Sequence, residues 1–549
     1  MTPMTSILTR RLTGGIGVAF LLCAMPSVAV QPQSAAEPRP APQARAALPL
    51  GPKNLAETRT VRRLQAGVTL TTIVRGAVDP AHVWTVEVAI SASSSPDPDA
   101  PPTALSDRAR AEATADRLRT AGYDPRVEPV DTPPTADYVG GRLGWRVRIG
   151  HFDNRAESEA LLTQLRSAGY VGANRFTGWD GASTDRGPWR LQVLTIDPHR
   201  FDGSLIASYG PDIEDRETTS ALSQAVGATA AVNAGYFVLD PASGAPGDPA
   251  GVGVYGGKLL SETVGERPAL VLGDDARGTT VERLHWTGTL HGRRGVRLNL
   301  DGINRVPGLI RNCGGTADDL PTALALHDFT CTDGDELVAY TAQFGQMTPV
   351  GPGLEVILNR QRRVVSMRSP RGGPLLAGYQ SVQATGSAVN QLRRVAAVGS
   401  PLTFSRKLVN QRGDVVKTPR STSIVNGGPV LVRRGKVHVT PARDGFVRPT
   451  NPSFYYGFSS SRNPRTFAGV DASGRTILAT ADGRSTNSLG LSITETGAVA
   501  KALGMRSALN LDGGGSTTMV VGGRVTNQPS DATGERPVGD SLLILPPDR

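Results

Sequence analysis

The sequence predicts an α+β protein in which a small βαββαβ split sandwich precedes a large, mixed, β-rich α+β domain. One observation is a weak repeat at an offset of 47 residues in the first third of the chain. A second is the composition, since Gly 64 and Pro 41 with only 5% aromatic residues favour turn-rich β structure. A third is a series of apolar, strand-like runs in the second half that end in polar residues and glycine.

Length and charge narrow the classes of protein. A chain of 549 residues is too long for a single core and predicts several domains. The formal net charge of +10 suits an envelope with anionic polymers, although a merely basic surface explains it equally well. We expect no nucleic-acid partner.

The N-terminus is typical of an export signal. Arg10 and Arg11 precede an apolar stretch over 16–24, and small residues follow where a signal peptidase would cut. The stretch is too short for a convincing transmembrane anchor. We therefore predict a signal peptide over 1–29 and a secreted or extracytoplasmic, cell-wall associated protein.

The next segment, 30–54, is rich in Pro, Ala and Gln without apolar periodicity, and this composition predicts a flexible or polyproline-like linker. A leading strand is expected over 64–74. It opens a small domain, 55–180, and the large domain is expected over 186–549.

The repeat defines the small domain. Residues 110–124 and 157–171 each predict a helix that ends at a glycine, Gly122 or Gly169. Strands are expected on either side of each helix, over 84–90, 125–130, 145–149 and 171–176. The order strand, helix, strand, strand, helix, strand predicts a split βαβ sandwich.

This unit resembles the SPOR domain through the tandem pattern, the strand RVRIGHF and the helix end LRSAGY. The resemblance implies binding to peptidoglycan glycan strands. Trp145, Arg146 and Arg148 are candidates to face the glycan, but alternate positions on a strand are more often core and surface. A plain scaffold role stays open.

Four apolar runs of the large domain end at an acidic or amide side chain with glycine close behind. Glycine adopts positive φ freely, and successive N–H groups in such turns can hold an anion. The simpler interpretation of each is a tight turn with a polar cap. The runs and their candidate residues are 230–237 with Asn233 and Tyr236, 423–432 with Asn426, Gly427 and Gly428, 475–484 with Asp482 and Arg484, and 508–531 with Asp512, Gly513, Gly514, Gly515, Ser516 and Thr517.

Further residues are second-tier candidates, because ordinary caps and salt bridges are the more frequent explanation for such residues. Glu495 lies in the first turn of a helix expected to begin at the cap Thr494. The others are Asn527, Asp531, Glu535 and Arg536. Cys313 and Cys331 predict one disulfide in an exported chain, worth about 3 kcal/mol.

Together the four runs resemble the phosphodiester glycosidase family, through NAGYF, NGGPVLVRRGK, TFAGVDASGRTILATADGR and NLDGGGSTTMVV in that order. The resemblance implies hydrolysis of a glycosidic bond with a phosphate monoester as leaving group. It implies that Asp482 and Asp512 stabilise the sugar carbon, one of them as nucleophile or base. Arg484, the glycine amides and the hydroxyls of Ser516 and Thr517 would neutralise the phosphate.

Two other functions remain open at this point: a non-catalytic, peptidoglycan-binding scaffold that keeps the fold, and hydrolysis of the phosphoryl bond. We expect no cofactor. Oxygen-rich loops could take a divalent cation such as calcium, but no spacing specifies a metal site.

Overall fold

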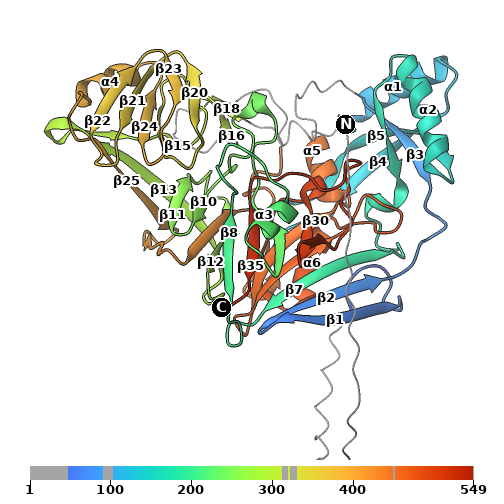
Figure 1. Ribbon diagram of the computed structural model, residues 1–549. Coiled ribbons are helices and arrows are strands. Elements are labelled where there is room, and N and C mark those ends of the chain that lie inside the picture. The colour runs from blue at the N-terminus through green and yellow to red at the C-terminus, as the bar shows by residue number, and fades with distance from the viewer. Residues whose placement is uncertain (1–46, 91–102, 312–319, 322–329, 449–451, 548–549) are drawn as a thin grey trace, which may run out of the picture. The chain divides into compact units, whose positions relative to one another are not determined.

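The computed structural model describes residues 47–90, 103–311, 320–321, 330–448 and 452–547 (Figure 1). The described chain is a strand-rich, mixed α+β protein, which confirms the predicted class at this level. The predicted signal peptide, the first part of the linker and Cys313 lie outside the described residues, so the disulfide stays a prediction. No helix among the described residues is long and apolar enough to cross a membrane.

The largest sheet is antiparallel and has two buried faces. Along β31, for example, Ile477 and Ala479 belong to one hydrophobic cluster and Leu478 to the cluster on the opposite face. This alternation is what a strand covered on both sides requires. In spatial order its strands are β1 (Glu57–Gln65), β2 (Val68–Arg75), β7 (Trp189–Ile196), β31 (Thr476–Ala481), β30 (Arg465–Asp471), β32 (Met505–Asn510), β28 (Val430–Arg433) and β29 (Lys436–Val437).

Helix α6 (Ile493–Ala502) contributes to the core on one face of this sheet, and further strands contribute to the core on the other. A five-stranded sheet there contains β34 (Arg524–Val525), β33 (Met519–Val521), β9 (Ala230–Asn233), β35 (Ser541–Leu545) and β8 (Ser204–Ser208), with α3 (Thr219–Ala225) against it. A second large sheet contains β11 (Lys258–Ser261), β10 (Gly253–Tyr255), β27 (Thr422–Asn426), β12 (Pro268–Gly273), β13 (Thr280–His291), β25 (Thr403–Asn410) and β26 (Val415–Val416), with β14 (Arg297–Asn299) beside β13.

A separate hydrophobic cluster lies under another five-stranded sheet and α4 (Ala388–Val395). The sheet contains β15 (Gly302–Ile303), β19 (Leu337–Tyr340), β24 (Gln380–Ala384), β21 (Leu354–Leu358) and β22 (Val364–Arg368). Smaller sheets pair β16 (Ile310–Arg311) and β17 (Leu320–Pro321) with β18 (Thr330–Thr332), and β20 (Met347–Gly351) with β23 (Arg371–Pro374).

The small domain is a four-stranded sheet with two helices. Its elements in chain order are β3 (Trp84–Val88), α1 (Arg108–Thr120), β4 (Pro125–Thr132), β5 (Gly141–Phe152), α2 (Arg155–Ser167) and β6 (Gly172–Phe176). The sheet order is β4-β5-β3-β6. Apolar residues of β3 and β5 pack against the two helices, so the helices cover one face of the sheet.

The leading strand differs from the prediction in two ways. The chain forms a hairpin of β1 and β2 rather than one strand, because Gly67 turns with φ +70°. A side chain at that glycine would lie 2.5 Å from the backbone nitrogen of Phe201. The hairpin pairs with β7, so it extends the largest sheet rather than the small domain.

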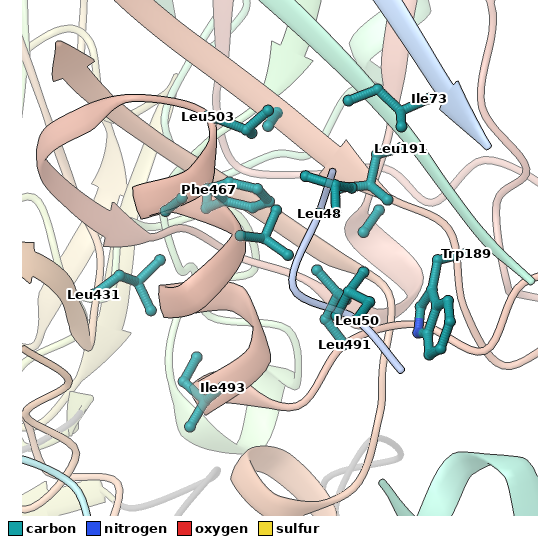
Figure 2. Close-up of a cluster of buried hydrophobic side chains, with 14 of the residues drawn as sticks. Leu48, Leu50, Ile73, Trp189, Leu191, Leu431, Phe467, Leu491, Ile493 and Leu503 are labelled. Carbon is teal, nitrogen blue, oxygen red and sulfur yellow. The ribbon is translucent and has the colours of Figure 1, made fainter. Parts of the chain in front are cut away.

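The end of the predicted linker is buried rather than flexible. Leu48 and Leu50 are each 1% exposed and lie among Trp189, Leu491 and other core side chains (Figure 2). The buried Arg75 fixes this segment, since its guanidinium donates to the carbonyls of Leu50 and Pro52 at 2.7 and 2.9 Å. Two leucines in a Pro-rich stretch do not by themselves predict burial, because only the tertiary structure supplies the side chains that cover them.

Candidate active site

Three strands of the largest sheet bring the predicted acidic residues to one edge. Both β31 and β32 are antiparallel to β30, which lies between them, so β31 and β32 run in the same direction. Their carboxyl ends therefore meet where β30 begins at Arg465. Asp482 directly follows β31, and Asp512 follows β32 after one residue.

Asn233 connects this edge to the end of β9. Its side-chain nitrogen donates to the carbonyl of Asp512 at 2.8 Å. Its side-chain oxygen accepts from the hydroxyl of Thr466 at 2.7 Å and from the backbone N–H of Thr518 at 3.1 Å. The side chain is fully buried and engaged, so it positions Asp512 from within the protein.

Asn426 positions the neighbouring Tyr236. Its amide oxygen accepts from the Tyr236 N–H at 2.9 Å and its amide nitrogen donates to the Tyr236 carbonyl at 3.1 Å. The Tyr236 hydroxyl donates to the carbonyl of Gly428 at 2.7 Å and accepts from the side chain of Asn510 at 2.8 Å. The motifs at 233–236 and 426–428 thus meet at one tyrosine.

The glycine turn after Asp512 is a 3₁₀ turn over Gly514–Ser516, with φ +59° at Gly514. Its amides are not arranged as the predicted anion-binding nest. The N–H of Gly513 donates to the Asp512 carboxylate, and that of Gly514 to the Pro464 carbonyl, both at 3.0 Å. The N–H groups of Ser516 and Thr517 donate back into the turn. The turn therefore shapes the site, and four of its N–H groups are already engaged within the protein.

Gly515 lies close to the ends of two charged side chains. An ideal Cβ built there would lie 2.2 Å from Nη2 of Arg536 and 2.3 Å from Oδ1 of Asp531. These two side chains form an ion pair at 2.7 Å against the turn. The structure therefore brings Asp531 and Arg536 to the same loop as Asp512.

Arginines that the sequence interpretation did not single out lie around Tyr236. Burial, with a contribution from the charge of Arg484, lowers the pKa of Arg465 to about 10. Burial, with contributions from Arg311 and Arg448, lowers the pKa of Arg267 to about 10. Guanidinium groups in such surroundings favour an anionic neighbour. Arg465 directly precedes the strand motif TFAGVD, but only the fold shows which way its side chain faces.

Tyr236 experiences charges of both signs. Burial raises its pKa well above the usual range, the charge of Asp512 raises it further, and Arg465 and Arg267 lower it. The Asp512 carboxylate and the two guanidinium groups therefore act on the same phenol. Next to Tyr236, the rings of Phe446 and Phe458 are stacked with centroids 4.8 Å apart.

Arg484 approaches the glycine turn from the β31 side. It adopts φ +54°, and its Nε donates to the side chain of Asn463 at 3.2 Å. Its Nη2 lies 3.2 Å from an ideal Cβ built at Gly514, so glycine leaves room for this guanidinium. Arg484 therefore lies close to the 513–515 turn.

Asp482 is buried and contacts a different loop from Asp512. Its Oδ1 accepts from the Gln528 N–H at 3.0 Å, and burial raises its pKa against the lowering effect of Gln528 and Asn527. Asn527 in turn accepts from the Met519 N–H at 2.7 Å and donates to the Thr517 carbonyl at 2.9 Å. Asp482 is thereby linked through Asn527 to the segment that follows the glycine turn.

Two second-tier residues serve other parts of the fold. Glu495 is the third residue of α6, whose N-cap is Ser492 rather than the predicted Thr494, and the two form a capping box. Glu495 also pairs with Arg462. Glu535 accepts from the Ser220 N–H at 2.9 Å at the start of α3. Both carboxylates are thus engaged at the start of a helix.

Arg146 and Arg148 of the small domain are paired inside the protein rather than presented to a glycan. Arg148 is 1% exposed and contacts Glu87 at 2.9 Å and Asp180 at 2.6 Å. Arg146 contacts Asp180 at 3.0 Å. The structure thus favours the core-and-surface interpretation for these two strand positions.

Within the described ranges, no group of three or more His, Cys, Asp or Glu side chains is placed to hold a metal ion. The fold and the site define a strand-rich α+β protein in which a carboxylate and several guanidinium groups meet at the edge of a buried sheet. Such a site suits a ligand with an anionic part.

Residues 353–545 match the family model of the phosphodiester glycosidases, and residues 103–175 match that of the SPOR domain. The chain therefore carries a phosphodiester glycosidase domain and a SPOR domain.

Curated relatives include N-acetylglucosamine-1-phosphodiester alpha-N-acetylglucosaminidases. The mouse protein is 31% identical over 20% of this chain and 21% of its own length. The human protein is 25% identical over 34% of this chain and 39% of its own length. The chain thus spans between a fifth and two fifths of these relatives.

A crystal structure of a protein of Burkholderia pseudomallei described as exported is similar with a TM-score of 0.80 and 34% identity, over 91% of this chain and 98% of that one. A hypothetical protein from Synechocystis shares the fold at a TM-score of 0.51 and 16% identity, over 90% and 81%.

Proposed function

We propose that this protein is a hydrolase that cleaves the glycosidic bond of a sugar-1-phosphodiester and releases free sugar and a phosphate monoester. The observation that carries the proposal is the position of Asp512 and the arginines Arg465 and Arg267 about one tyrosine, Tyr236. The match to the family model and the names of the curated relatives support the same reaction.

The chemistry requires two kinds of charge stabilisation. A phosphate monoester has a second pKa near 6, so it leaves with less help from a general acid than an alcohol needs. Arg465 and Arg267 neutralise the departing phosphate, and burial makes their charges more effective than in water. The negative charge of Asp512 stabilises the cationic sugar carbon, as nucleophile or as the base that activates water.

The remaining predicted residues take positioning roles in this proposal. Asn233 and Asn426 fix Asp512 and Tyr236 through hydrogen bonds to the main chain. Asp482 fixes the loop at Gln528 and, through Asn527, the segment behind the glycine turn. Arg484 supports Asn463 and the turn, where it is within reach of the phosphate end of a ligand.

We place the activity outside the cytoplasm, on cell-wall or extracellular glycans. The SPOR domain implies peptidoglycan binding, and the similar Burkholderia structure is described as an exported protein. The Arg-rich start of the sequence followed by an apolar stretch agrees with export.

Substitution of the acidic residues tests the proposal. We expect Asp512→Asn to lower the release of reducing sugar from a sugar-1-phosphodiester by at least about a thousandfold, since it removes the charge beside the sugar carbon. Asp482→Asn is expected to cost less, because its amide oxygen can still accept from Gln528. Asp275→Asn, at an exposed carboxylate, is the control. Full activity of the folded Asp512→Asn protein would refute the assignment.

A non-catalytic, peptidoglycan-binding scaffold is the second candidate. Internal hydrogen bonds already satisfy the side chains of Asn233 and Asn426 and four amides of the glycine turn, as a purely structural role would require. Binding to purified peptidoglycan with no turnover of any sugar-1-phosphodiester would favour this role over the enzyme.

A further inference from the structure

The outer face of the small sheet is covered by the chain itself. The hydroxyl of Tyr456 donates to Glu87 at 2.8 Å and accepts from Arg148 at 3.2 Å, and Arg175 lies over its ring at 5.6 Å. Tyr456 belongs to a π-helical turn, Tyr456–Ser460, of the large domain. A glycan therefore cannot lie across the sheet at these residues without separating the two domains.

A cavity of about 440 Å³ opens beside this contact. Its walls come from six parts of the chain: the N-terminal segment at Pro49, the end of β4, Arg146 of β5, the loop 180–183, the π-helical turn and the start of α6. The volume lies within the range of about 300–1,000 Å³ that small-molecule sites occupy. All of these segments are among the described residues. They belong to both domains and to the buried N-terminal segment, which therefore build the cavity together.

The charged side chains that line the cavity are already paired. Arg146 contacts Asp180 at 3.0 Å, and Asp131 contacts Arg142 at 2.6 Å. Glu495 pairs with Arg462 at 2.6 Å. An ionic ligand would have to compete with these pairs, so the lining favours a neutral molecule.

Hydroxyl groups and tyrosine rings make up much of the remaining lining. Ser459 is 1% exposed, and its Oγ has no hydrogen-bond partner among the described residues although it lines the cavity. The hydroxyls of Ser460, Thr494 and Ser183 lie in the same walls, together with Tyr455 and Tyr456. A buried, unsatisfied hydroxyl costs free energy that a polar ligand can recover.

We propose that this cavity binds a neutral saccharide. Saccharides present many hydroxyls for the serine and threonine side chains, and they carry no charge to disturb the ion pairs. The inference goes beyond the proposed function, because the cavity does not include Asp512 and its binding does not require turnover.

The position of the cavity would couple such a ligand to the candidate active site. The carbonyl of Phe458, one residue before Ser459, accepts from the guanidinium of Arg465. The carbonyl of Gly457 accepts from Asn463 at 2.7 Å, and Asn463 also accepts from Arg484. A saccharide at Ser459 would thus lie next to the two carbonyls that Arg465 and Asn463 contact.

Calorimetric titration of the full chain with chitotetraose, a neutral oligosaccharide, tests the site. Ser183→Trp places an indole in the cavity from an exposed loop position and is expected to weaken binding more than thirtyfold. Thr184→Trp, at the next exposed residue, does not line the cavity and is expected to bind as the unaltered chain does. Equal loss in both variants, or saturable binding that neither alters, would overturn the proposal.

A second pair of variants tests the hydroxyl itself. Ser459→Ala is expected to weaken chitotetraose binding about threefold to tenfold, the effect of one hydrogen bond. Ser223→Ala removes another buried serine hydroxyl without a partner among the described residues, but in α3 and outside the cavity, and is expected to leave binding unchanged. Absence of chitotetraose binding to the unaltered, folded chain would also overturn the proposal.

Discussion

At the scale of single residues, the candidate site is built from side chains that hold other groups in place. Asn233, Asn426 and Asn510 each contact the main chain or the hydroxyl of another motif. The sequence predicted Asn233 and Asn426, because polar side chains before glycine are visible in a pattern. It did not predict Arg465 or Arg267, since their convergence on Tyr236 depends on contacts between distant segments.

Arg465 is the arginine whose loss we expect to affect catalysis most. It is 1% exposed, begins β30, and lies between Asp482 and Asp512 along the sheet edge. Arg465→Lys keeps a charge but loses the fork of donors, and we expect kcat/KM for a sugar-1-phosphodiester to fall about a hundredfold. Arg475→Lys, in a partly exposed pair with Asp471, is the control. Unchanged kinetics in Arg465→Lys would remove this residue from the phosphate site.

Asp540 makes stability depend on pH. Burial raises its pKa to about 6, although Tyr255 and the Gly235 N–H donate to it at 2.7 and 2.6 Å. A raised carboxyl pKa favours the folded state below about pH 4, and this contribution is lost as the pH rises through 6. As the pH rises from 4 to 7.5, the free energy of unfolding of Asp540→Asn, measured with urea, is expected to rise by about 2 kcal/mol relative to that of the unaltered chain. An identical pH slope for both proteins would contradict this.

At the scale of elements, strand ends and turns were predictable and the N-terminal segment was not. The sequence identified β9, β27, β31 and β32 because each is an apolar run with a polar end. The segment at Leu48 and Leu50 resembles a linker in composition, and only its packing against side chains such as Trp189 and Leu491 makes it part of the core (Figure 2). The helix start was placed two residues late, because Thr494 and Ser492 are both good caps.

The burial of the segment at Leu48 and Leu50 contributes to the free energy of unfolding, and a substitution can measure this contribution. Leu50→Ala removes a side chain that is 1% exposed and is expected to lower the free energy of unfolding by about 2–5 kcal/mol. Leu376→Ala, at a residue 63% exposed, is expected to change it by less than about 0.5 kcal/mol. Urea midpoints compare the two. Equal midpoints would show that the segment does not contribute to the core in solution.

At the scale of the whole molecule, a cluster of ion pairs inside the small domain meets Tyr456 of the glycosidase domain, whose hydroxyl donates to Glu87 and accepts from Arg148. The charges of Arg148 and its neighbours hold the pKa values of Glu87 and Asp180 below their usual range in spite of burial. Their stabilising contribution is therefore present above about pH 4 and is lost as the pH falls through the lower folded values. Tandem sequence similarity predicted the SPOR domain, but the partners of its arginines come from segments far away in the chain.

Removal of Arg148 tests this junction. Arg148→Met leaves the buried Glu87 and the partly buried Asp180 without their main partner and is expected to cost about 3–5 kcal/mol at pH 7. Arg142→Met, whose pair with Asp131 is exposed, is expected to cost less than about 1 kcal/mol. The difference should shrink toward pH 3 in urea unfolding. A constant difference across this range would contradict the electrostatic origin.

The central claim is that the protein breaks a bond at a sugar carbon and leaves the phosphorus untouched. Hydrolysis of a sugar-1-phosphodiester in oxygen-18 water, followed by mass spectrometry of both products, tests this directly. We predict one labelled oxygen in the released sugar and none in the phosphate monoester. Label in the phosphate monoester, with unlabelled sugar, would show attack at phosphorus and contradict the account.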